Sequence, residues 1–211
     1  MKKALLLIDL QLDFCKNGAL AVPDGNAVIP VANRLTVEGK WDNITASIDW
    51  HSPTHKSFAS NNPGKKVGDI IKLNGLDQFL WPDHCVVGSK GAELHPNLIT
   101  GKIALMLRKG MNPEIDSYSA FNSNGHREQT GLCGYLKELN IGEVYILGLA
   151  LDYCCKYTAL DAVALGFKTH LILDGVRAVN INPTDGDKAV AEMKEKGVVV
   201  VKSDNLLGVK K

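Results

Sequence analysis

Four side chains able to carry out chemistry each end or follow a short apolar run of the chain. They are Asp9, Asp49, Lys109 and Cys154. In an open α/β sheet, ligands bind beyond the carboxyl ends of the strands, near the point where the strand order reverses. If the four runs form neighbouring strands, their terminal side chains converge on one crevice.

Cys154 stands where a helix is expected to begin. Unpaired backbone N–H groups and the positive end of a helix dipole favour the thiolate, which is the nucleophilic form of cysteine. A small buried thiol without a chemical role is the alternative. Position alone does not separate Cys154 from Cys155, because adjacent residues on a helix point in different directions.

Asp9 and Lys109 supply the groups that a cysteine nucleophile needs. A carboxylate between Ile8 and Leu10 has to be solvated, paired or catalytic, and capping of a nearby helix or turn is the structural alternative. Lys109 by itself could be an ordinary surface lysine. Together, Asp9 could carry the thiol proton to the leaving amine, while Lys109 holds the carboxylate and stabilises the thiolate. An acyl-thioester would then form and be hydrolysed by water.

The sequence Asp49-Trp50-His51 suggests a metal site. Residues two apart on a strand point the same way, so both side chains can reach one ion. His84 and His55 are candidates to complete the set, and three Asp/His ligands leave positions open for water or substrate. A hydrogen-bonded surface pair is the alternative explanation for such a motif.

The elements that must position these residues alternate between strand and helix. Apolar runs cover 4–9, 43–49, 103–108, 143–149, 168–174 and 198–202, and helical spacing covers 28–37, 130–139, 154–165 and 183–196. This alternation predicts an α/β fold with three α/β/α layers around a mostly parallel, six-stranded, Rossmann-like sheet. Residues 52–100 do not follow this alternation of strands and helices, and a loop of that length is usually functional.

Composition sets the broader class of protein. The 211 residues, of which 45% are hydrophobic, predict a single domain over 1–211 with a sizeable core. A formal net charge of +1 argues against a nucleic-acid or membrane partner. An odd number of cysteines and no secretory signal predict reduced thiols and a cytoplasmic location. The sequence leaves a homo-oligomer open.

Several short motifs follow one another in a fixed order along nearly the whole chain. They are Leu7-Ile8-Asp9-Leu10-Gln11-Leu12-Asp13-Phe14, Asp49-Trp50-His51, Ser57-Phe58-Ala59, Trp81-Pro82-Asp83-His84-Cys85-Val86, Gly91-Ala92-Glu93-Leu94-His95-Pro96, Arg108-Lys109-Gly110, Asp116-Ser117-Tyr118-Ser119-Ala120-Phe121 and Gly148-Leu149-Ala150-Leu151-Asp152-Tyr153-Cys154. In this order they resemble the nicotinamidases, within the isochorismatase-like cysteine hydrolases. The resemblance implies the isochorismatase-like hydrolase fold.

The resemblance assigns roles that position left open. The first cysteine of the Asp-Tyr-Cys motif is the family's nucleophile, which implies Cys154 rather than Cys155. Asp9 would be the acid and base, and Lys109 the third member of the triad. A cis peptide bond before Ala150 would turn its N–H, together with that of Cys154, toward the developing oxyanion.

The resemblance also implies a metal and a binding pocket. The metal ligands would be Asp49, His51 and His84, with His55 or Ser57 as a further protein contact. The ion, zinc by preference and otherwise iron or manganese, would bind the ring nitrogen of a pyridine and so orient its carboxamide. Aromatic walls of that pocket would be Phe14, Trp81 and Tyr118.

The implied reaction is the hydrolysis of nicotinamide to nicotinate and ammonia in NAD salvage, with pyrazinamide as a second substrate. Isochorismatases lack the cysteine that stands here at 154. Hydrolases of ureido or carbamoyl substrates keep a triad but generally lack the metal set, and they remain an alternative. A non-catalytic metal-binding protein would need a triad member to be missing. The chain departs from the common motif at Leu151 and Cys155, where Thr and Val are usual.

Overall fold

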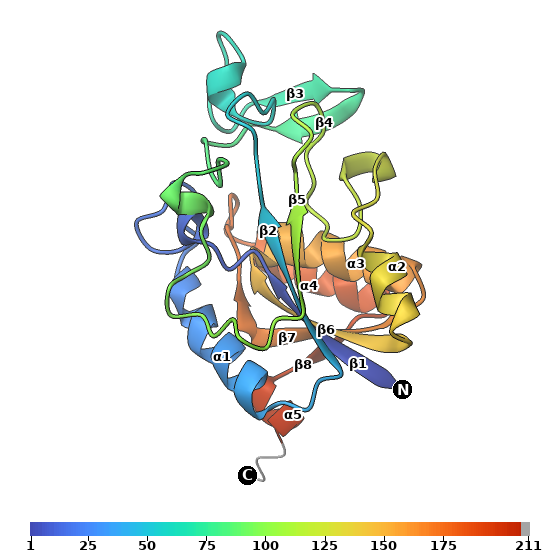
Figure 1. Cartoon of the computed structure of the whole chain (residues 1–211). Coiled ribbons are helices and arrows are strands. Elements are labelled where there is room, and N and C mark those ends of the chain that lie inside the picture. Colours follow the sequence, from blue (N-terminus) through green and yellow to red (C-terminus); the bar gives the residue numbers. More distant parts are fainter. Residues whose placement is uncertain (208–211) are drawn as a thin grey trace.

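A computed structural model describes residues 1–207 of the chain, and its centre is a six-stranded parallel sheet. The strands lie in the order β5-β2-β1-β6-β7-β8 (Figure 1). Their bounds are β1 Lys2–Ile8, β2 Asn43–Asp49, β5 Leu105–Lys109, β6 Ile141–Leu149, β7 Lys168–Arg177 and β8 Val199–Val201. The predicted parallel sheet is confirmed. The predicted single domain runs to residue 211, and its last four residues lie outside the described part of the chain.

Helices cover both faces of the sheet, which gives the three predicted layers (Figure 1). The bounds are α1 Val28–Glu38, α2 Leu132–Glu138, α3 Lys156–Ala164, α4 Asp185–Glu195 and α5 Ser203–Leu207. In β1, Leu5 and Leu7 pack in the core under α1, while Leu6 and Ile8 pack in the core under α2, α3 and α4. The unbroken apolar run of β1 is the consequence, because a strand covered on both faces has no polar side.

The strand order reverses between β1 and β6. From β1 the chain builds outward through β2 and β5 on one side, and from β6 through β7 and β8 on the other. Such a switch point leaves a crevice at the carboxyl ends of the two central strands. Asp9 directly follows β1, and residues 150–154 directly follow β6, so both lie at this crevice.

Residues 52–100 contain a feature that the sequence reading missed. An antiparallel hairpin of β3 Ile70–Leu73 and β4 Leu76–Phe79 stands beyond the carboxyl ends of β2 and β5 (Figure 1). Its turn is Asn74-Gly75, with φ of 48° and 81°. Positive φ at both positions is the type I′ arrangement, for which Asn-Gly is the strongest short-range signal. The Asn-Gly dipeptide therefore indicates this hairpin in the sequence.

No helix within residues 1–207 is long and apolar enough to cross a membrane.

Candidate active site

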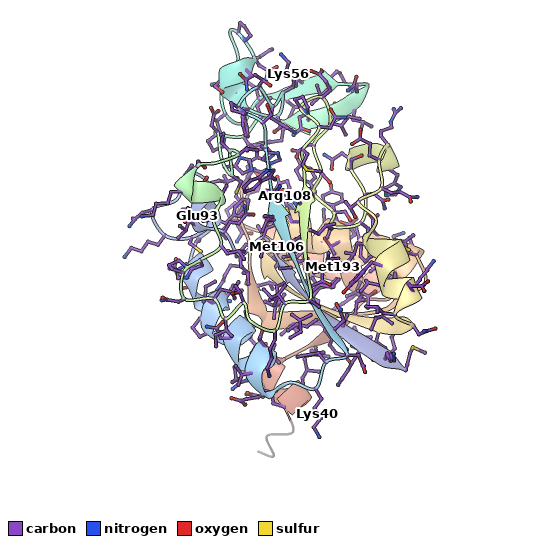
Figure 2. All side chains as sticks on the ribbon, in the orientation of Figure 1. Lys40, Lys56, Glu93, Met106, Arg108 and Met193 are labelled. Atoms are coloured by element: carbon purple, nitrogen blue, oxygen red, sulfur yellow. The ribbon has the colours of Figure 1, made fainter. Side chains whose placement is uncertain are left out.

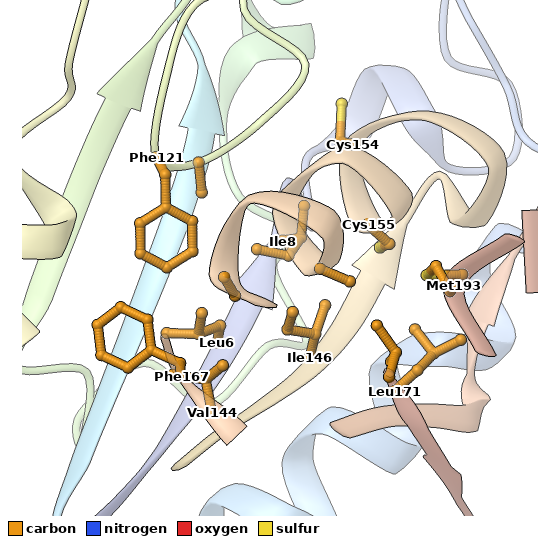
Figure 3. Packing of buried hydrophobic residues seen from close by; sticks show 14 of the residues in the cluster. Leu6, Ile8, Phe121, Val144, Ile146, Cys154, Cys155, Phe167, Leu171 and Met193 are labelled. Carbon is orange, nitrogen blue, oxygen red and sulfur yellow. The ribbon is translucent and has the colours of Figure 1, made fainter. Parts of the chain in front are cut away.

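Cys154 lies in a π-helical turn, Leu151–Cys155, that joins β6 to α3. Figure 3 shows its sulfur pointing away from the packed core, whereas the Cys155 side chain lies inside that core near Ile146 and Met193. Both cysteines are free. Cys155 is fully buried, and Cys154 is 6% exposed. The local turn therefore gives the two neighbouring cysteines different environments.

The buried surroundings of Cys154 oppose the preference for the thiolate that a helix N-terminus gives. Burial raises the pKa of the Cys154 thiol well above its ordinary value, and the nearby Asp9 carboxylate adds to the rise. The Lys109 ammonium opposes this change without reversing it. The neutral thiol is thus the resting form, and a base has to remove its proton as the sulfur attacks.

Lys109, at the end of β5, is the centre of the buried charges. Its Nζ lies 2.9 Å from Asp9 Oδ2 and 2.5 Å from Asp49 Oδ1. It also donates to the Ser117 carbonyl at 2.8 Å and to Cys154 Sγ at 3.4 Å. Burial would lower its pKa, but the two carboxylates raise it well above the ordinary lysine value, so the ammonium stays charged.

The pKa values of the two carboxylates that share this lysine are shifted in opposite directions. Burial raises the pKa of Asp9 to about 6, although Lys109 lowers it and Ser47 donates to Oδ1 at 2.7 Å. Burial also disfavours ionised Asp49, but Lys109, His51 and His84 together hold its pKa well below its usual range. Asp49 is therefore ionised at every physiological pH, and Asp9 is the carboxylate able to exchange a proton near neutrality.

The structure brings the predicted metal residues together. Asp49 Oδ2 lies 3.6 Å from His51 Nε2 and 3.9 Å from His84 Nε2, and all three residues are buried. The other ring nitrogens are engaged, with His51 Nδ1 2.8 Å from the Gly110 carbonyl and His84 Nδ1 2.8 Å from the Pro82 carbonyl. A carbonyl partner at Nδ1 fixes the tautomer that presents Nε2 to a metal ion.

Gly110 is required for that arrangement. It has φ of 65°, and a Cβ there would lie 2.4 Å from the His51 ring. A side chain at this position would displace the ring from the carbonyl that orients it. The small residue after Lys109 is explained by the histidine packed against it.

His55 and Ser57 lie beside this group in different roles. The His55 ring is 4.4 Å from the His51 ring, centre to centre, and its buried Nε2 has no hydrogen-bond partner within residues 1–207. Its Nδ1 lies 2.7 Å from Ser57 Oγ. Burial lowers the pKa of His55 to about 4, so the ring is neutral and able to ligate. Ser57 contacts His55 and thereby orients it.

Asp116 is a buried acidic residue that the sequence reading left without a role. Ligand atoms of Asp116, His51 and His55 all lie within 4.8 Å of one another. Its side chain accepts hydrogen bonds from Gln78 Nε2 at 3.0 Å and from the Ser117 N–H at 2.8 Å. Its place in the motif 116–121 was the available signal. This group and the group of Asp49, His51 and His84 share His51, and each supplies carboxylate and imidazole donors that suit a divalent metal ion.

The predicted aromatic residues line a pocket that reaches Cys154. Phe14, Trp81 and Tyr118 share this pocket with Asp49, His84 and Asp116. Sequence reading missed four further lining residues: Leu20, Ala150 as a wall, Tyr153 and Val179. Tyr153 packs edge-on against Trp81 with ring centres 4.8 Å apart, and it stands in the motif that contains Cys154. The pocket is apolar except toward the metal residues and the thiol.

The peptide bond between Leu149 and Ala150 is cis, as the resemblance implied. Ala150 directly follows β6 and lines the pocket, four residues before Cys154.

The fold and this buried cysteine site are those of a hydrolase family, and the isochorismatase domain family matches residues 3–205, so the chain belongs to it. A nicotinamidase of Escherichia coli is 48% identical over 200 residues, which cover 94% of this chain and 93% of that one. A solved nicotinamidase/pyrazinamidase of Acinetobacter baumannii superposes with a TM-score of 0.94 at 43% identity, covering 98% of both chains. A pyrazinamidase of Pyrococcus horikoshii in complex with zinc has a TM-score of 0.77 at 33% identity, covering 96% and 99%.

Proposed function

We propose that this chain is a nicotinamidase, which hydrolyses nicotinamide to nicotinate and ammonia through a thioester on Cys154. The observation that carries the proposal is that Cys154, which Lys109 joins to buried Asp9, lines an aromatic pocket that Asp49 and His84 also line. Such a pocket suits a flat ring with a carboxamide at one end and a ligating nitrogen at the other. The nicotinamidase relatives support this choice.

In the proposed mechanism Asp9 moves the proton. With a pKa of about 6 it is ionised at neutral pH yet basic enough to accept a proton from the Cys154 thiol, with which it lies within 4.8 Å. The sulfur attacks the carboxamide carbon, and Asp9 returns the proton to the departing nitrogen, which leaves as ammonia. Asp9 then takes a proton from water as its oxygen attacks the thioester carbon; the carbon–sulfur bond breaks, the sulfur regains the proton from Asp9, and nicotinate is released.

Lys109 supports this proton transfer. Its fixed positive charge holds Asp9 in place and stabilises negative charge on sulfur as the proton leaves. The backbone N–H groups of Ala150 and Cys154 would donate to the oxyanion of the tetrahedral intermediate.

Asp49, His51 and His84 would hold a divalent metal ion, with His55 or Asp116 as further donors. Bound there, the ion supplies a Lewis-acid site that holds the ring nitrogen of the pyridine. Zinc is the proposed ion, supported by the zinc complex of the Pyrococcus relative, and iron or manganese suits the same ligands. Phe14, Trp81 and Tyr118 would pack against the pyridine ring.

The product would enter NAD salvage as a pyridine carboxylate. We also propose a cytoplasmic location, which the five free cysteines support because thiols stay reduced there.

The test is ammonia release from nicotinamide by the purified, zinc-loaded protein. Wild type should be active and Cys154→Ala inactive, while Cys133→Ala, which changes a half-buried cysteine outside the site, should keep wild-type activity. Pyrazinamide, which keeps a suitable ring nitrogen, should be hydrolysed, and benzamide, which lacks it, should be poor. Inactive wild type would refute the proposal and direct attention to ureido and carbamoyl substrates, and equal rates on benzamide would refute the role of the ring nitrogen.

A further inference from the structure

Gln11 belongs to the motif that carries Asp9, yet the proposed reaction does not use it. Its side chain is completely buried. Asp9 has φ of 48°, which turns the chain away from the sheet, and the pairing of β1 with β2 ends at Ile8 and Ser47 apart from one further bond from the Asp9 N–H. Asp49 is the last residue of β2 and so lies beyond the reach of the β1 backbone.

The side-chain amide of Gln11 occupies the place of the missing strand. Gln11 Nε2 donates to the Asp49 carbonyl at 2.8 Å, and Gln11 Oε1 accepts from the Asp49 N–H at 2.7 Å. A primary amide presents a donor and an acceptor side by side, as a peptide group does across a sheet. On the opposite edge of β2, Trp50 donates to the Lys109 carbonyl at 2.9 Å, so the backbone around Asp49 is held from both sides.

A third hydrogen bond fixes the amide itself. Gln11 Nε2 also donates to the Ala92 carbonyl at 2.9 Å. The backbone next to Gln11 is joined to the same segment, since the Leu12 N–H donates to the carbonyl of Glu93, which is labelled in Figure 2. The amide therefore cannot rotate without breaking contacts on two separate segments.

We propose that Gln11 is a positioning residue that sets the affinity of the metal site by fixing the backbone of Asp49. The fixed backbone determines where Asp49 Oδ2 stands relative to His51 Nε2 and His84 Nε2, at 3.6 and 3.9 Å. This inference rests on the proposed metal-binding role of Asp49. Groups that orient a metal ligand typically contribute about 10- to 100-fold to metal affinity.

The test compares Gln11→Met with a matched control, Asn33→Leu. Both replacements remove an amide of similar size that binds backbone through its donor and its acceptor. Asn33 donates to the Asn97 carbonyl and accepts from the Ile99 N–H, each at 2.7 Å, in a segment without site residues. Zinc affinity is measured on metal-free protein by competition with a chromophoric chelator, and thermal unfolding is measured on the same metal-free samples.

Gln11→Met should bind zinc about 10- to 100-fold more weakly than wild type, and Asn33→Leu should bind it as wild type does. Equal zinc affinities of Gln11→Met and wild type would overturn the inference, even if the variant unfolds at a lower temperature. If Gln11→Met does not fold, Gln11→Asn keeps the amide but shortens its reach, and the same comparison applies. Wild type that binds no zinc would refute the proposed metal site first, which distinguishes that failure from a failure of Gln11 alone.

Discussion

Two groups of charged side chains lie at opposite ends of the same sheet. At the carboxyl end, Lys109 and Asp9 form an ion pair at 2.9 Å with both side chains 0% exposed. At the amino end, Lys168 and Glu143 form a pair at 3.1 Å, but the lysine side chain is 57% exposed. The residue types are nearly the same, and the difference in burial is what separates a chemical site from a surface pair.

The pKa values of the two carboxylates show the consequence. Burial outweighs Lys109 and raises the pKa of Asp9, whereas at Glu143 the hydrogen bonds from Lys168 and Tyr145 outweigh a smaller burial effect and lower the pKa. A carboxylate beside a lysine can thus become a neutral-pH base or a stronger acid. The segment 52–100, together with the turn after β6, encloses the carboxyl end and decides which outcome holds there.

The largest expected effect is the difference in activity and stability between substitutions of the two lysines. Lys109→Met leaves Asp9 and Asp49 buried without their cation, so activity should fall by several orders of magnitude and stability by about 3–5 kcal/mol. Lys168→Met removes an exposed pair and should cost less than about 1 kcal/mol. Initial rates of ammonia release and urea unfolding measure both. Similar losses in the two variants would contradict the comparison.

A second contrast concerns two buried histidines. His51→Ala removes a proposed ligand, and its zinc affinity should fall by more than about 100-fold, because losing a ligand costs more than losing its support. His170→Ala, at the amino end, should bind zinc as wild type does. Zinc content after dialysis, read by atomic absorption, checks this, and full occupancy in His51→Ala would refute the ligand assignment.

The third contrast is in the pH dependence of kcat/KM. Asp9 must be ionised to accept the thiol proton, so kcat/KM should fall about tenfold per unit as the pH drops below its pKa of about 6. Glu143→Gln should leave this acid limb unchanged. Rates are measured with saturating zinc at each pH, and a flat profile between pH 7 and 5 would rule out Asp9 as the base.

The smallest expected effect is on His170 itself. Both ring nitrogens are buried without hydrogen bonds within the described residues, and the ring stacks on Tyr145 at 4.2 Å. Burial lowers the pKa of His170 below its ordinary 6.5, so the unfolded chain takes up the proton first and stability is lost as the pH falls through that value. His170→Phe keeps the stacking, and it should be neutral or stabilising by about 1 kcal/mol. Its gain in melting temperature should be larger at pH 5 than at pH 8, and a lower melting temperature at both would contradict this account.

Local sequence patterns predict most strands of the central sheet. The run from Ala4 to Ile8 predicted a doubly covered strand because all its residues are apolar, and β1 is buried on both faces. The predicted β7 stopped at 174, but the strand continues to Arg177 through an irregularity in its pairing with β6. Such an irregularity depends on the neighbouring strand, and no local pattern announces it.

The sequence by itself determined which chemical groups the protein carries and that they stand at the ends of strands, because strand and helix periods are local properties of the chain. Only the tertiary structure decided that Lys109 joins Asp9 to Asp49, and that Asp116 lies beside His51. It also decided that the Cys154 thiol rests protonated. Contacts between residues far apart in the sequence, and the burial they produce, set these properties, since a pKa depends on the surroundings of a group and not on its neighbours along the chain.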